Sequence, residues 1–413
     1  MGSLAQVLTT TRPRPGWSLL GPAFVAAIAY VDPGNVAANV SGGAQFGFLL
    51  LWVIVLANAM AALVQYLSAK LGLVTGLSLP EAVAERMRRP IRLTYWAQAE
   101  LVAMATDLAE VVGGAIALHL LFGLPLVLGG FITGAVSLLL LVAQKGGQHL
   151  FERVITGLLL IIAIGFLTSL VVQPPPVGPA LAGLLPRFHG SESVLLAAAM
   201  LGATVMPHVV YLHSGLARDR HGNPDAGRQR RRLLRITRWD VGLAMCIAGA
   251  VNLAMLVTAA TNLQGRHDTD SIEGAHAAIR DTLGPTVALF FAIGLLASGL
   301  ASTSVGAYAG AVIMQGLLRR TIPLLTRRLI TLVPAMMILA IGFDPSRALV
   351  MSQVVLSFGI PFALAPLIRL TSERNLMGDD TNHRLTTALG WTIAVLITLL
   401  NVVLIYLTLT GAA

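Results

Sequence analysis

Two short stretches of the sequence combine side chains that can bind a cation with residues that break a helix. The first runs from Asp32 to Asn35 (DPGN), the second from Met206 to His208 (MPH), and apolar residues flank both. Proline removes a backbone donor and disfavours helix in the residue before it, so each stretch should interrupt a membrane helix. The freed carbonyls are tolerable in a membrane where they line a cavity or bind something. The helix-breaking residues are Pro33, Gly34 and Pro207.

The two stretches offer different kinds of ligand. Asp32 supplies a carboxylate and Asn35 an amide oxygen, whereas Met206 supplies a thioether, a soft ligand that Mg²⁺ and Ca²⁺ do not seek. Met206 precedes its proline as Asp32 precedes the other, so equivalent positions carry one soft and one hard ligand. Such a mixed site suits Mn²⁺ or Fe²⁺. Two alternatives stay open at this point: a surface turn at DPGN, and a methionine that only packs.

Three acids lie within another apolar run. Glu100, Asp107 and Glu110 are spaced by seven and three residues, which places them on one face of a helix. Acids in a membrane are costly, and rows of them mark proton relays. The nearest basic candidates are Arg327 and Arg328, at the start of a later apolar segment. The alternative is an interfacial Glu100 and two buried structural ion pairs.

Further polar residues interrupt the apolar segments. His208 can bind a metal or carry a proton. Gln353 either faces the pathway or makes a packing hydrogen bond, and the sequence favours neither. A stripe of small residues at intervals of four indicates close helix packing. The stripe consists of Gly294, Ser298, Ser302, Gly306 and Gly310.

The composition is that of a membrane protein. The 413 residues are 56% hydrophobic and only 11% charged, and the mean hydropathy is +0.78, whereas soluble domains carry about 25% charged residues. The single cysteine, Cys246, excludes a disulfide within the chain and a thiolate metal cluster. The N-terminus shows no signal-peptide cleavage pattern. No H-E-x-x-H motif and no paired catalytic acids are present, so we expect no enzyme.

A membrane helix needs about 20 mostly apolar residues, and we count eleven candidate segments. With the N-terminus in the cytoplasm, 24 of the 28 Lys and Arg residues fall on the cytoplasmic side and the C-terminus lies outside. The basic run Arg228–Arg238 is then a cytoplasmic loop facing anionic lipid, and we expect no nucleic-acid partner. The segments are 18–40, 46–72, 95–121, 124–143, 152–173, 193–215, 236–262, 285–317, 328–343, 346–370 and 386–409.

Five segments begin at each break, and five is odd, so the second group must lie inverted relative to the first. Inverted repeats with paired broken helices are the layout of secondary transporters, which bind substrate at the membrane midplane. We therefore expect a cytoplasmic tail at 1–17, a first repeat at 18–173, a second at 174–370, and a loop with an eleventh helix at 371–413.

These features resemble the Nramp family of proton-coupled manganese and iron transporters, also called the MntH or DMT group. The resemblance rests on the DPGN stretch and on Ala203–His208 (ATVMPH), which correspond to that family's two signature stretches. It also covers Thr106–Glu110 (TDLAE) and Ser352–Pro361 (SQVVLSFGIP), and extends from about Gly21 to the last helix.

The resemblance implies an all-α fold of LeuT type, with two inverted five-helix repeats, an eleventh helix, and helices 1 and 6 unwound mid-membrane. It implies import of Mn²⁺ or Fe²⁺ coupled to protons by alternating access in a bacterial inner membrane. No permanent cofactor and no obligate protein partner are expected. The implied metal shell is Asp32, Asn35, Met206, the carbonyls of Ala29 and Ala203, and Gln353 in an occluded state. The implied proton pathway is Asp32, His208, Glu100, Asp107, Glu110, Arg327 and Arg328.

Two other transport functions fit the same layout. A sodium-coupled symporter for an organic solute would set helix N-termini against a substrate carboxylate, but Asp32 would repel that group and Met206 would ignore it. A passive metal channel would differ from a coupled carrier in saturation and in pH dependence.

Overall fold

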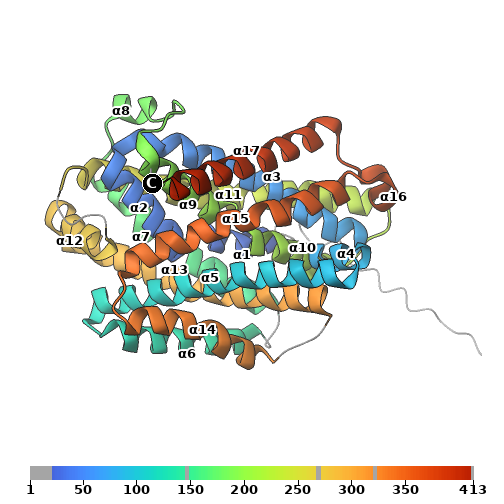
Figure 1. Cartoon of the computed structure of the whole chain (residues 1–413), viewed down its shortest axis with the longest axis horizontal. Coiled ribbons are helices and arrows are strands. Elements are labelled where there is room, and N and C mark those ends of the chain that lie inside the picture. Colours follow the sequence, from blue (N-terminus) through green and yellow to red (C-terminus); the bar gives the residue numbers. More distant parts are fainter. Residues whose placement is uncertain (1–20, 145–147, 267–270, 320–322, 411–413) are drawn as a thin grey trace, which may run out of the picture.

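The computed structural model describes residues 21–144, 148–266, 271–319 and 323–410, and within these ranges every regular element is a helix. The longer helices run roughly along the long axis of the molecule and pack side by side (Figure 1). Eight helical stretches are long and apolar enough to cross a membrane, by length and composition. The tail expected at 1–17 lies outside the described ranges.

Each of the eleven expected segments coincides with a helix of the described ranges. The two interrupted segments are α1 (Pro22–Ala29) with α2 (Pro33–Phe46), and α9 (Gly190–Thr204) with α10 (Pro207–His221). The others are α3 (Leu51–Thr75), α5 (Arg89–Phe122), α6 (Leu126–Gln144), α7 (Gln148–Val172), α11 (Arg228–Asn262), α13 (Pro285–Ile313), α14 (Leu324–Ala340), α15 (Pro345–Thr371) and α17 (Arg384–Leu409).

Short elements in the connections were not among the expected segments. They lie at the two ends of the long axis, with α4 and α16 at one end and α8 and α12 at the other (Figure 1). We call these the α4 end and the α12 end. These elements are α4 (Leu79–Arg86), α8 (Val177–Ala182), α12 (Ile272–Leu283), α16 (Arg374–Met377), the 3₁₀ turns η2 (Gly47–Leu50) and η4 (Gly378–Asp380), and the π-helical turn η3 (Met314–Leu318).

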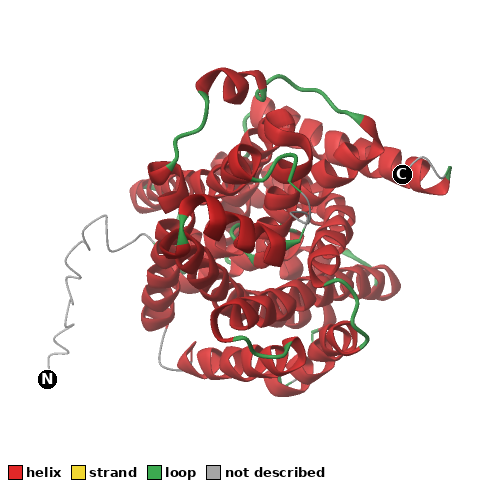
Figure 2. Ribbon diagram, turned by 90° about the vertical axis from the view of Figure 1, so that its left-hand side faces the viewer, coloured by secondary structure: helices red, strands yellow, loops and turns green. Residues whose placement is uncertain are grey.

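The broken helices form the centre of the bundle. Helix α2 packs against α9, α11 and α15, while α10 packs against α3, α13 and α15. Helix α13 also packs along α5 and α7, and α6 and α14 lie together at one edge (Figure 1). Seen with the molecule turned by 90°, helices also occupy the middle of the bundle (Figure 2). The breaks therefore lie inside protein, where freed backbone groups can find partners.

Both breaks occur at the expected prolines. Pro33 and Pro207 occupy the first position of α2 and α10, where the missing backbone N–H needs no partner. Asp32, Asn35 and Met206 are each 0% exposed. The surface-turn alternative for DPGN is therefore wrong, because these side chains lie in the core of the bundle.

Candidate functional site

Asp32 uses its two carboxylate oxygens differently. It is the N-cap of α2, and its Oδ1 accepts a hydrogen bond of 2.7 Å from the backbone N–H of Asn35. Its Oδ2 has a long contact of 3.5 Å from Gln353 Nε2. One oxygen is thus committed to starting α2, while the other is nearly free to bind something else.

Asn35 joins the two breaks directly. Its Nδ2 donates to Asp32 Oδ1 at 2.8 Å and to the carbonyl of Ala203, next to last in α9, at 2.9 Å. Its own Oδ1 is buried and has no hydrogen-bond partner among the residues that the structure describes. Because Ala203 lies at the C-terminal end of its helix, the partial negative charge there favours a cation.

Gln353 of α15 reaches over the first break. Its Oε1 is buried and has no partner in the described part of the chain, while Nε2 bonds Ser352 Oγ at 3.2 Å. A Cβ at position 34 would overlap the Gln353 amide, so Gly34 is what allows this close approach. The Gln353 amide thus lies beside Asp32 and also makes a packing hydrogen bond to Ser352, so both sequence alternatives for Gln353 remain open.

Met206 and Ala29 are buried at the two breaks: Ala29 is the last residue of α1, and Met206 immediately precedes α10. Met206 is the N-cap of α10 and makes no side-chain capping bond, and the Ala29 carbonyl accepts a weak bond of 3.3 Å from Asp32 N–H. Of the expected metal shell, hydrogen bonds connect Asp32, Asn35, Ala203 and Gln353. Ala29 joins them through the bond from Asp32 N–H, and Met206 has no hydrogen bond to the other five among the described contacts.

The donor set fits a cation. Buried oxygens in native proteins are almost always partnered, yet Asn35 Oδ1 and Gln353 Oε1 are not, and both belong to the same cluster as the Asp32 carboxylate. No group of three or more His, Cys, Asp or Glu residues is arranged to hold a metal in the described ranges. A metal at this cluster would therefore use one acid, neutral oxygens and a thioether.

Two acids of the row are paired with the two predicted arginines. Arg328 Nη1 lies 2.5 Å from Asp107 Oδ1, with both side chains 1% exposed, and Arg327 Nε lies 3.1 Å from Glu100 Oε1. The Glu100 side chain is 17% exposed. Burial therefore decreases along α5 from Asp107 toward its N-terminal end, which is the α4 end.

Glu110 differs from the other two acids. It is 1% exposed, its Oε2 has no hydrogen-bond partner, and no ion pair to it is found in the described ranges. The alternative drawn from the sequence was that Asp107 and Glu110 both form buried structural ion pairs. Among the described residues, Asp107 forms such a pair and Glu110 does not.

The small-residue stripe on α13 does more than allow helix packing. A Cβ at Gly306 would meet the Glu110 carboxylate, and one at Gly310 would meet the Arg327 guanidinium. The stripe thus makes room for two charged side chains, an aspect that the four-residue spacing alone does not reveal.

His208 connects the second break to α5. Its Nδ1 lies 3.2 Å from Thr106 Oγ1, and its Nε2 is buried with no partner within the described ranges. Thr106 precedes Asp107, so His208 lies between the break and the acidic row. Thr106 was not singled out from the sequence, because a bond within the helix usually satisfies a hydroxyl in a membrane helix. Thr106 makes such a bond, from Oγ1 to Val102 O, in addition to its contact with His208.

Other buried polar contacts at the first break were also missed. Tyr30 bonds Gln65, and Gln65 Oε1 lies 2.7 Å from His213 Nδ1. Asn252 and Ser298 donate to the backbone carbonyls of Tyr30 and Val31. A polar residue inside an apolar segment was the available signal for each, but it does not say which neighbour the residue meets.

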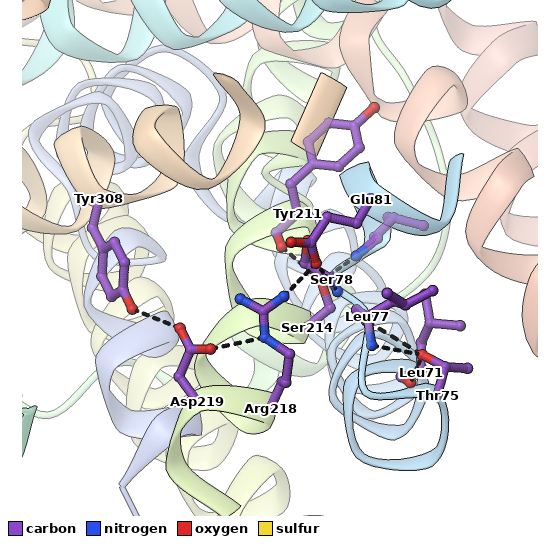
Figure 3. Close-up of polar contacts among 11 residues, drawn as sticks. Leu71, Thr75, Leu77, Ser78, Glu81, Tyr211, Ser214, Arg218, Asp219 and Tyr308 are labelled. Carbon is purple, nitrogen blue, oxygen red and sulfur yellow. Dashed lines mark hydrogen bonds and ion pairs between the residues drawn. The ribbon is translucent and has the colours of Figure 1, made fainter. Parts of the chain in front are cut away.

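A polar network joins the end of α10 to neighbouring helices at the α4 end. Arg218 pairs with Glu81 of α4 and with Asp219 at 2.8 Å, and Tyr308 of α13 donates to Asp219 at 3.2 Å (Figure 3). The same α10 segment bonds α4 through Ser214, whose Oγ accepts from Leu79 N–H at 2.8 Å. These contacts close the α4 end around α10.

A cavity of about 280 Å³ lies toward the opposite end. Its lining includes Ser41 and Gln45 of α2 and Val350 and Met351 of α15, the helices that carry Asn35 and Gln353. Glu192 also lines it. The structure thus combines a hollow on the side of α2 and α15 with a polar closure at the α4 end.

Known solved structures share this fold. The chain superposes on the manganese transporter of Eremococcus coleocola with a TM-score of 0.84 and 31% identity, covering 97% of this chain and 90% of that one. A nucleobase–cation symport family transporter, at 17% identity and a TM-score of 0.59, covers 95% of this chain and 92% of that one and shares the fold alone. The fold is therefore of LeuT type, as predicted.

Sequence relatives are closer still. The divalent metal cation transporter MntH of Mycobacterium tuberculosis is 72% identical over 412 residues, covering 100% of this chain and 96% of the relative. The protein of the same name from Klebsiella pneumoniae is 47% identical and covers 95% of each chain. These transporter names agree with the prediction of a transporter rather than an enzyme. A family model described as natural resistance-associated macrophage protein-like matches residues 23–407, and the chain belongs to this Nramp family.

Proposed function

We propose that the chain imports divalent transition metals, Mn²⁺ and Fe²⁺, together with protons, by alternating access in a bacterial inner membrane. The observation that carries the proposal is the contact between the two breaks through Asn35, which brings the Asp32 carboxylate and the Ala203 carbonyl to one amide. The names of the mycobacterial and enterobacterial relatives support the same substrate class.

Metal selectivity rests on the ligand chemistry of the two breaks. Asp32, Asn35 and the carbonyls of Ala29 and Ala203 supply oxygen, and Gln353 adds an amide oxygen when the site closes. Met206 supplies sulfur, which transition metals accept and Mg²⁺ and Ca²⁺ do not seek. Ala203 and Met206 lie on either side of the end of α9. The second break would therefore supply both an oxygen and a sulfur ligand, while the first break supplies oxygen ligands.

Protons move along the buried polar residues between Asp32 and the acidic row of α5. Metal binding needs Asp32 in its charged form, so metal and proton compete for this carboxylate. The proton leaves past His208 and the acids Asp107, Glu110 and Glu100, with Arg327 and Arg328 beside them. The growing exposure toward Glu100 supports a route that ends at the α4 end.

Alternating access uses the two inverted groups, residues 18–173 and 174–370. The closed α4 end and the hollow at the other end support an outward-facing arrangement, with α4 in the cytoplasm. Metal enters from the α12 end, and movement of α1 and α10 against α7 and α13 opens the site inward. An inside-negative potential of 100 mV favours each positive charge by about 2.3 kcal/mol.

The test is Mn²⁺ uptake into proteoliposomes with excess Ca²⁺ or Mg²⁺ as competitor. Wild type should ignore the excess, and Met206→Ala should be inhibited by it, because the ligand that discriminates against hard ions is gone. Met200→Ala is the matched control: Met200 is also 0% exposed in α9 and precedes the break. If wild type moves no Mn²⁺ at any pH or voltage, the metal function is refuted and organic-solute symport becomes the alternative to test.

A further inference from the structure

Two consecutive backbone carbonyls at the first break are each held by a side chain from a different helix. Asn252 Nδ2 of α11 donates to the Tyr30 carbonyl at 2.7 Å. Ser298 Oγ of α13 donates to the Val31 carbonyl at 2.5 Å. Both residues follow the end of α1 and precede Asp32, so their carbonyls have left the helical ladder and need outside partners.

Ser298 stands apart from the neighbouring hydroxyl residues of α13. Ser302 donates to Ser298 O, Thr303 to Gly299 O and Ser304 to Leu300 O, all within their own helix. Ser298 is 0% exposed and, of these four, is the one whose hydroxyl bonds another element. Its bond therefore cannot be explained as the usual satisfaction of a helix hydroxyl.

The bond acts next to the site. Val31 immediately precedes Asp32 in the chain, and Ala29 lies two residues before Val31. The two bonds hold the peptide groups of Tyr30 and Val31 from two different helices. Only a few backbone torsions separate these peptide groups from the Ala29 carbonyl and the Asp32 carboxylate, so the bonds also restrict the directions of both ligands. Groups that orient metal ligands typically affect metal affinity or activity by about 10- to 100-fold.

We propose that Ser298 is a positioning residue for metal binding, with Asn252 as its partner on the neighbouring carbonyl. Neither side chain contacts the metal in this proposal. Each holds the unwound segment so that two of the expected ligands converge on the Ala203 carbonyl and Met206. The inference rests on the proposed metal transport, and the experiment separates the two.

The experiment compares Ser298→Ala with Ser304→Ala in Mn²⁺ uptake by proteoliposomes. Both substitutions remove one buried hydroxyl from α13, but Ser304 bonds only within its own helix. We expect Ser298→Ala to raise the KM for Mn²⁺ about tenfold with kcat within about twofold of wild type. Ser304→Ala should match wild type in both constants.

Thermal unfolding in detergent gives a second readout. Ser298→Ala should unfold near the wild-type temperature without metal, and should gain less stabilisation from added Mn²⁺. An unchanged KM, or a loss confined to kcat that accompanies lower metal-free stability, overturns the positioning role. If wild type and Ser304→Ala both fail to move Mn²⁺, the proposed function itself falls and the inference with it.

Discussion

The Asp32 side chain has two tasks that its oxygens divide between them. Oδ1 begins α2 by accepting the Asn35 N–H, whereas Oδ2 faces Gln353 at a distance too long for a strong bond. A single carboxylate thus belongs both to the secondary structure and to the candidate site. Substitutions at this position can separate the two tasks, because only the second needs a negative charge.

Asp32→Asn should keep the helix cap and lose metal transport. Asparagine caps helices about as well as aspartate, so the purified variant should unfold near the wild-type temperature. Loss of the charged ligand should reduce Mn²⁺ uptake at least about 100-fold, since it removes the acid of the cluster. Asp32→Ala should lose both cap and transport. Uptake in either variant comparable to wild type would contradict a ligand role for this carboxylate.

Arg328→Gln should destabilise the fold more than Arg327→Gln. Removing the arginine leaves Asp107 buried without its ion-pair partner, a loss of about 3–5 kcal/mol for a fully buried pair. Arg327→Gln is the matched control, since its partner Glu100 is partly exposed and water can replace the lost contact. Thermal unfolding in detergent measures both. Equal losses of stability would mean that burial does not distinguish the pairs.

At the scale of elements, the two broken helices could be predicted from the sequence. The side chains from other helices that bond the unwound backbone could not. Proline with adjacent polar residues in apolar runs indicated both interruptions, and Arg327 and Arg328 were named as the nearest basic candidates for the acids. By contrast, Ser298, Ser302 and Gly306 form one repeating pattern in the sequence. Only the packing of α13 against α5 and the first break shows that one hydroxyl holds a carbonyl and one glycine faces Glu110.

The short connecting helices escaped prediction for a related reason. Elements such as α4 and α12 are too short to give a membrane-spanning signal, and their sequences are polar enough to pass for loops. The capping box of α4, in which Ser78 N–H and Oγ both donate to Glu81 at 2.7 Å, was the available local signal.

Tyr308→Phe should loosen the closure at the α4 end. The hydroxyl bond to Asp219 is one of the contacts between α13 and α10, so its loss should favour opening around α10 (Figure 3). Ala217→Cys in a Cys246→Ser background reports this opening, because position 217 of α10 is 2% exposed. Maleimide should modify it several-fold faster with Tyr308→Phe than without it. Tyr406→Phe, on an exposed side chain of α17, should leave the rate unchanged; a rate unaffected by Tyr308→Phe would exclude this bond as a closing contact.

At the scale of the whole molecule, the ends of the bundle agree with the distribution of charge. The connections that hold α4 and α16 are basic and lie at one end, while α8 and α12 lie at the other (Figure 1). Sequence alone could predict which connections share a side, because charge and segment count decide it. It could not predict which end is closed, since closure depends on side-chain contacts between distant segments.

Cysteine labelling in cells tests the proposed orientation. Position 173, between α7 and α8, and position 225, between α10 and α11, are both exposed. In a Cys246→Ser background, Gln173→Cys should react with a membrane-impermeant maleimide in intact cells. Asp225→Cys should react only after the cells are permeabilised. The reverse pattern would invert the proposed topology, and labelling of both in intact cells would reject it.

The amide of Asn35 has a consequence for the step in which a carrier returns without cargo. In the structure, this –NH₂ group bonds the Asp32 carboxylate, through Oδ1, and the Ala203 carbonyl, two of the groups that the proposal assigns to the metal. A neutral donor thereby links these two groups when no cation is bound. After release, the protein need not reorient the two groups without a partner between them, so the unloaded return is less hindered and the cycle can repeat.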